Sequence, residues 1–109
     1  MKTDYQIKEI MTKVTNLLLV KNASYGDSAT KPCNIFAKGS AIENICARID
    51  DKLARIKNKG LDESTYDTID DLMGYLCLLK IAIAEDALSG AELELKELNG
   101  RILKESKTK

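Results

Sequence analysis

The chain has 109 residues, 44% of them hydrophobic and 31% charged, which supports one small core rather than two, so we expect a single domain over residues 1–109. Its 17 basic residues balance its 17 acidic ones, so no overall positive field attracts long nucleic acid or an anionic membrane, and neither is expected as a partner. Histidine is absent, which excludes the usual general base and the commonest transition-metal ligand.

Apolar residues recur at spacings of three and four in a composition rich in helix formers, which predicts an all-α protein with four helices. The first helix is expected over about 4–20, after a capping box formed by Thr3 and Gln6. Segment 21–40 then loses the helical periodicity and contains two glycines and the one proline. We expect a functional loop there, because loops of this length in a small domain are usually functional or flexible.

The second helix is predicted over about 40–58. Ser40 is its expected N-cap, with Glu43 three residues later, and Gly60 ends it. Its apolar residues form one stripe for the core: Ile42, Ile45, Cys46, Ile49, Leu53 and Ile56.

The third and fourth helices are predicted over about 63–88 and 90–105, separated by a capping box of Ser89 with Glu92. From 72 to 84 the third helix is apolar on nearly every face, so it needs cover on all sides. We therefore expect a four-helix bundle completed by oligomerisation. The fourth helix carries a short pairing seam at roughly heptad spacing: Leu88, Ala91, Leu95, Leu98 and Ile102.

The cysteines indicate the compartment. Cys33, Cys46 and Cys77 are an odd number without a CxxC pair, which fits neither a disulfide framework nor a zinc site and is typical of a reducing cytoplasm. Cys46 and Cys77 lie in apolar runs and are predicted to pack in the core, whereas the role of Cys33 stays open. The N-terminus has no apolar signal core, and the longest apolar stretch, 72–84, is shorter than a bilayer span, so we expect a cytoplasmic protein.

Carboxylates near the start of the third helix are candidate metal ligands. Asp67 and Asp71 are four residues apart, so both point from one face, and like charges at this spacing favour a cation between them. Asp51 of the second helix is a candidate third ligand, and Mg²⁺, or Mn²⁺ in its place, is the expected ion. The alternative is that Asp67 completes a capping box with Ser64, since acids in a first turn suit the helix dipole.

The second helix concentrates charge beside its apolar stripe. Arg48, Asp51, Lys52 and Arg55 form either a solvated, salt-bridged face or one wall of a site. Asp51 lies nearly opposite the stripe, which would suit a site between this face and a neighbouring helix. Spacing alone leaves both interpretations open.

The start of segment 21–40 offers residues that suit a nucleotide. Lys21 supplies a cation for phosphate, Asn22 an amide for a base edge and Tyr25 a ring for a base face, while Gly26, followed by Asp27, permits close backbone approach. The alternative is an ordinary turn with Gly26 at positive φ.

Three ordered motifs together resemble a known family. They are KNASYGDS at 21–28, RIDDKLAR at 48–55 and DTIDDLMGYL at 67–76. The chain is similar over 21–79 to the phage and bacterial family called nucleotide modification associated domain 1, whose pattern reads KNxDYGD, R-x-x-D-K-x-x-R and D-T-x-x-D-L-x-x-Y. Ser24 departs from it, since the family tends to have an acid there. A bacterial or phage-infected cell is the implied setting.

That family is in turn similar to the MazG-type all-α pyrophosphatases, which are oligomeric helical bundles that cleave nucleoside triphosphates with Mg²⁺. The resemblance implies a nucleotide-binding hydrolase that forms a homo-oligomer. In this hydrolase the carboxylates would bind metal and the cations would neutralise phosphate. Tyr25 would pack on the base or sugar of the nucleotide, and Asp70 would serve as the general base. The expected metal ligands are Asp51, Asp67 and Asp71, and the expected phosphate ligands are Lys21, Arg48, Lys52 and Arg55.

The acidic pattern is incomplete beside that of the MazG type. Thr68 stands where the glutamate of an ExxD motif would be, and the second helix has no paired ExxE. Two further functions therefore stay open: a non-catalytic protein that sequesters a nucleotide or a cyclic-nucleotide signal, and a helical adaptor whose apolar helices dock on a partner.

Overall fold

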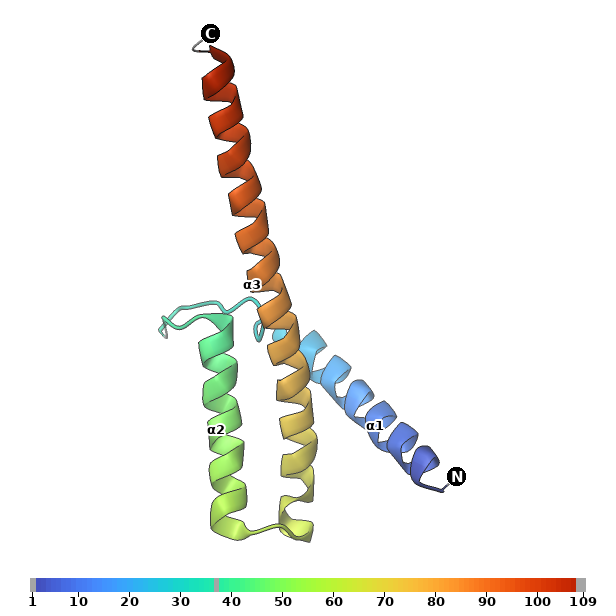
Figure 1. The fold of residues 1–109 in the computed structure, drawn as a ribbon. Coiled ribbons are helices and arrows are strands. Elements are labelled where there is room, and N and C mark those ends of the chain that lie inside the picture. Colours follow the sequence, from blue (N-terminus) through green and yellow to red (C-terminus); the bar gives the residue numbers. More distant parts are fainter. Residues whose placement is uncertain (1, 37, 108–109) are drawn as a thin grey trace.

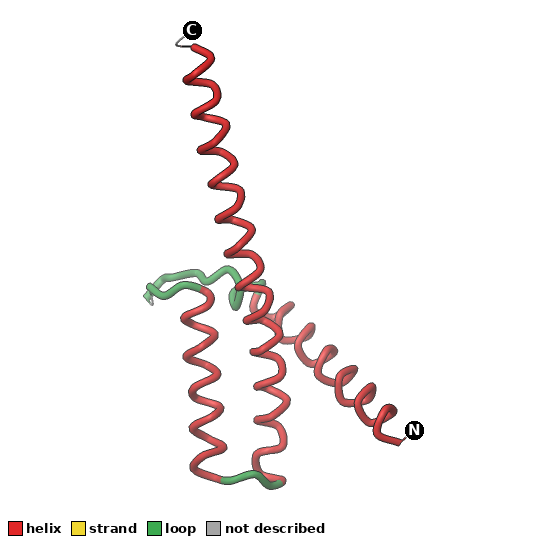
Figure 2. The backbone as a smooth tube through the Cα atoms, in the orientation of Figure 1, coloured by secondary structure: helices red, strands yellow, loops and turns green. Residues whose placement is uncertain are grey.

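The computed structural model describes residues 2–36 and 38–107. These residues form the helices α1 (Lys2–Tyr25), α2 (Ala41–Lys59) and α3 (Tyr66–Lys107), with a 3₁₀ turn, η1 (Glu63–Thr65), before α3. Figures 1 and 2 show helices joined by two loops, and no strand occurs in these described ranges. The all-α prediction is confirmed.

The helices are arranged around the first half of α3. α2 runs antiparallel beside this half, and α1 crosses it at an angle, with the N-terminus pointing away (Figure 1). The second half of α3 projects beyond both partners, so the molecule measures 71 × 41 × 25 Å. Its radius of gyration of 20.0 Å exceeds the value of about 13 Å that a compact domain of this length would have.

Both predicted ends of α2 are confirmed. The Ser40 hydroxyl accepts a hydrogen bond from the Glu43 N–H at 3.1 Å and so caps the first turn. Gly60 adopts a φ of 87°, and its N–H donates to the Ile56 carbonyl at 2.7 Å. The left-handed φ at Gly60 ends the helix and turns the chain back toward α3.

A side-chain cap fixes the turn between α2 and α3. Asp62 accepts from the Ser64 N–H at 2.8 Å, and the fully buried Thr65 hydroxyl donates to the Gly60 carbonyl at 2.8 Å. The hydrogen bonds donated by Ser64 lower the pKa of Asp62. The capping role considered for Ser64 with Asp67 therefore belongs to Asp62 and Thr65.

The prediction for the first helix was wrong at both ends. α1 begins at Lys2, so Thr3 lies inside the helix and does not cap it, and α1 continues to Tyr25 instead of ending near residue 20. The last turns of α1 hold Lys21 and Asn22 in helical geometry, because the chain leaves the helix only at Gly26, whose φ is 57°. The predicted loop over 21–40 is therefore shorter at its start.

The predicted division of residues 63–105 into two helices was also wrong. α3 is continuous through Ser89 and Gly90, so the described chain has three α-helices and not four. One glycine costs a helix only about 1 kcal/mol, and Ala, Leu and Glu on both sides favour continuation. Within the described residues, no other helix packs beside α3 at this point (Figure 1). A four-helix MazG-like bundle stays a prediction.

The core is small and lies where α2 meets α3. Ile45, Leu78 and Ala82 are buried in it, and Leu18 of α1 packs against them. Cys46 and Cys77 are exposed, so the prediction that they pack in the core is wrong for the single chain, and Leu53 is exposed as well. Within the described residues, none of the helices has the length and hydropathy needed to cross a bilayer.

Candidate functional site

A cleft with a volume of about 490 Å³ opens where the end of α1, the following loop, α2 and α3 converge. Its polar lining combines cationic, amide, hydroxyl and phenol side chains from four segments of the chain. These residues are Lys21, Asn22, Tyr25, Ser28, Asn44, Arg48 and Tyr75. Leu18, Ile45 and Leu78 form its apolar floor, so the cleft sits directly on the core.

The end of α1 positions one wall of this cleft. Gly26 and Asp27 both have positive φ, 57° and 64°, and the Asn22 side chain donates to the Asp27 carboxylate at 2.6 Å. Ser28 N–H donates back to the Tyr25 carbonyl at 3.1 Å. The turn thus fixes Asn22, while Tyr25 remains 69% exposed at the rim. The positive φ predicted for Gly26 is confirmed.

Asp71 joins the three helices beside the cleft. One carboxylate oxygen lies 3.1 Å from Lys21 Nζ of α1, and the other lies 3.1 Å from Lys52 Nζ of α2. Burial alone would raise the pKa of Asp71, but the hydrogen bonds from Lys21 and Lys52 outweigh it and hold this pKa below its ordinary value of 3.8. Two cations predicted to neutralise phosphate therefore bind a carboxylate of the same chain.

The three predicted metal ligands do not form one group within the described residues. Asp51 and Asp67 are exposed and do not line the cleft, and neither does Arg55. No three side chains capable of binding a metal gather anywhere in the part of the chain that the structure describes. Asp70, the predicted base, is buried and pairs with Lys13 of α1 at 3.7 Å.

A small hollow of about 40 Å³ lies between α1 and α3, next to the cleft. Asp70 and Asp71 both line it, and it shares Leu18, Lys21 and Tyr75 with the cleft. The two neighbouring carboxylates are therefore close to the cleft without lining it.

Sequence reasoning missed three polar residues of the cleft: Ser28, Asn44 and Tyr75. Tyr75 belongs to the DTIDDLMGYL motif but was interpreted only as part of a helix that is apolar on nearly all faces. Asn44 and Arg48 are four residues apart on α2 and so share a face, which is the signal that would have indicated Asn44.

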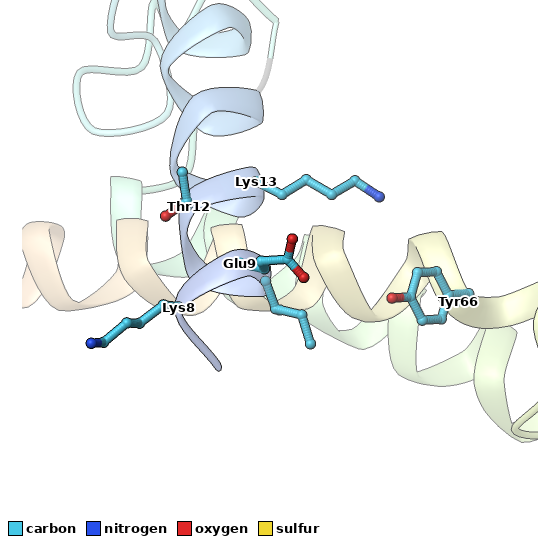
Figure 3. A pocket seen from close by; sticks show the side chains of 6 residues that line it. Lys8, Glu9, Thr12, Lys13 and Tyr66 are labelled. Atoms are coloured by element: carbon cyan, nitrogen blue, oxygen red, sulfur yellow. The ribbon is translucent and has the colours of Figure 1, made fainter. Parts of the chain in front are cut away.

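A second, wider hollow lies between the diverging part of α1 and the start of α3 (Figure 3). Lys13 and Glu9 extend toward Tyr66, and Lys13 Nζ lies 5.7 Å from the ring centroid, whereas Lys8 points away. Because this hollow contains none of the predicted site residues, we take the cleft at the end of α1 as the candidate site.

No known protein family, curated protein or solved structure matches this chain. The resemblance to the nucleotide modification associated domain 1 family stays a prediction based on its three motifs.

Proposed function

We propose that the chain is a MazG-like nucleotide-binding protein and that the cleft at the end of α1 holds the nucleotide. The observation that supports this most is that Tyr25, Tyr75, Asn44 and Arg48 line one cleft from three helices. Phenol rings stack on a base, an amide hydrogen-bonds a base edge, and a guanidinium binds phosphate oxygens. The apolar floor excludes water beneath the base.

Binding without hydrolysis agrees best with the surroundings of Asp71. Both of its carboxylate oxygens are held by lysine ammonium groups, and these cations would compete with a metal for them. Asp51 and Asp67 do not lie beside Asp71 in a three-ligand group within the described chain. A protein that sequesters a nucleotide or a cyclic-nucleotide signal needs no such group.

The second candidate is a Mg²⁺-dependent nucleoside triphosphate pyrophosphohydrolase, as the family resemblance implies. The hollow that places Asp70 and Asp71 next to the cleft favours it. Mg²⁺, or Mn²⁺, would polarise the phosphates when bound. Asp51, Asp67 and Asp71 are its proposed ligands, and they would have to approach one another to hold it.

Calorimetry with the common nucleoside triphosphates tests the cleft. Tyr25→Ala should weaken binding by about 1–3 kcal/mol, because it removes a ring that stacks on the base. Tyr5→Ala is the matched control, since Tyr5 is an exposed tyrosine of α1 outside the cleft. Equal affinity of the wild type and Tyr25→Ala would contradict the proposal and favour the adaptor.

Arg48 and Arg55 offer a second matched pair on one helix. Both are exposed, but only Arg48 lines the cleft. Arg48→Ala should reduce the affinity for a triphosphate and make binding less salt-sensitive, whereas Arg55→Ala should change neither.

Pyrophosphate release separates the two candidates. The wild type is incubated with triphosphates and Mg²⁺, beside Asp71→Asn and Tyr25→Ala. Turnover that is lost in Asp71→Asn would establish the hydrolase, whereas binding in the calorimeter without pyrophosphate release would establish the sequestering protein.

Self-association belongs to the same proposal. Ile7, Ile10 and Met11 of α1 and Leu76 of α3 are exposed apolar side chains that a second copy would cover to complete a four-helix bundle. Light scattering should therefore report at least twice the chain mass of 12.1 kDa.

A further inference from the structure

The described side chains in the second half of α3 pack against no other element. Every described side chain from Ile83 to Arg101 is exposed, and Ala82 is the last buried residue among the described side chains of α3. Figure 1 shows this half extending alone beyond α1 and α2. A lone helix in water is at best marginally stable, and Gly90 and Gly100 weaken this one further. Because α3 continues to Lys107, a partner that covers one face of this half would stabilise it.

A heptad pattern defines that face. Positions a and d fall on two apolar series that run through three repeats: Ile81, Leu88, Leu95 and Ile102 at a, and Ala84, Ala91 and Leu98 at d. Leu88, Leu95 and Leu98 are each more than half exposed. Leu78 and Ala82, which contact α2 in the core, occupy positions e and b, so the seam does not compete with α2.

The flanking charges favour a second copy in parallel orientation. In a parallel pair, a g residue faces the e residue five positions later in the partner. Lys80 at g would then face Glu85 at e in both directions, while Ala87 faces Glu92 and Glu94 faces Asn99. None of these three pairs is repulsive.

An antiparallel pair that aligns the full seam is repulsive at its flanks. It would place Glu85 opposite Glu92 and Lys80 opposite Arg101, each of them twice. Like charges at such distances disfavour that arrangement. Charge complementarity therefore distinguishes the two orientations.

We propose that residues 81–102 of α3 form a parallel two-stranded coiled coil with a second copy of the chain. This proposal concerns a different surface from the nucleotide cleft, so either one can fail without the other. The coil would cover the seam residues Ile81, Leu88, Leu95 and Leu98, which the single chain leaves exposed.

Sedimentation equilibrium of the full chain tests the seam. Leu95→Glu should raise the dissociation constant on the order of 100-fold or more, because it places two charges in the coil. Ile83→Glu is the matched control, since Ile83 is an apolar residue of the same half at position c and is exposed to a similar degree. Circular dichroism of both variants verifies that the helices persist. A monomeric wild type, or a Leu95→Glu variant that still dimerises like the control, would overturn the proposal.

Disulfide trapping tests the orientation. Cys33, Cys46 and Cys77 are exposed and are first replaced by serine. In this background Leu95→Cys should form a disulfide-linked dimer on mild oxidation, because equal positions meet only in a parallel coil. Trapping by the double variant Ala84→Cys/Leu95→Cys but not by Leu95→Cys alone would show an antiparallel pair and overturn the proposal.

Charge reversal tests the pairing of Lys80 with Glu85. Lys80→Glu should weaken dimerisation at least about twofold, and Lys80→Glu/Glu85→Lys should restore it, because the exchanged charges again face each other. Absence of this restoration would contradict the parallel register.

Discussion

The two halves of α3 both carry apolar residues at helical spacing, but their surroundings differ. From Tyr66 to Ala82 the helix packs on α1 and α2 and contributes Leu78 and Ala82 to the core. From Ile83 onward every described side chain is exposed, leucines included. The comparison teaches that the apolar pattern of a helix shows which of its faces need to be buried. It does not show whether another helix of the same chain lies against them, and here, within the described residues, α1 and α2 pack only on the first half.

The largest difference is expected from truncating a leucine or isoleucine in each environment. Leu78→Ala should lower the free energy of unfolding by about 2–4 kcal/mol, because it leaves a cavity in a small core. Ile83→Ala, five residues later, should change it by less than about 1 kcal/mol, since Ile83 is 51% exposed. Urea denaturation measures both, and equal losses would show that the projecting half is as well packed as the first.

Asp71 offers a test of the packed half at acid pH. Because its pKa in the folded chain lies below the ordinary value of 3.8, its contribution to stability is complete above that value. The contribution is lost as the pH falls through the folded pKa, since the unfolded chain takes up the proton first. Asp71→Asn should lower stability by about 1–2 kcal/mol at neutral pH and flatten the loss of stability in acid.

The control for this titration is Asp62→Asn. The pKa of Asp62 is also lowered, but mainly by hydrogen bonds from Ser64 within one turn, with only a minor contribution from the charge of Lys59. Thermal melts from neutral to acid pH measure this. In Asp62→Asn, the melting temperature should still fall with pH by the part that depends on Asp71. If both variants lose the pH dependence of stability to the same extent, the ion pairs of Asp71 contribute no more to it than the hydrogen bonds of Asp62.

The smallest effect is expected from glycines in the two halves. A Cβ at Gly90 would meet no atom within 4 Å, so Gly90→Ala should stabilise the helix by about 0.5–1 kcal/mol. A Cβ at Gly74 would lie 3.4 Å from the Leu18 side chain, so Gly74→Ala should gain less. Circular dichroism and thermal melts measure the difference, and a larger gain at Gly74 would contradict it.

The sequence by itself predicted the helical class and the bounds of α2. These features depend on contacts within a few residues: Ser40 with Glu43 at one end of the helix, and Gly60 with Ile56 at the other. The same local reasoning failed at Ser89 and Gly90, because a capping pattern ends a helix only where the chain has somewhere else to pack.

The tertiary structure decided which charged residues share a site. The sequence indicated Lys21 and Arg48 as ligands for phosphate, and the cleft contains both, but it could not show that Lys21 and Lys52 hold Asp71. It could not show that, among the described residues, Asp71 forms ion pairs and Asp67 does not, because helical spacing places both on one face whichever residues of other helices lie near them. Only the positions of α1 and α2 around α3 determine that one carboxylate is paired and the other exposed, since ion pairs between helices depend on packing distant in the sequence.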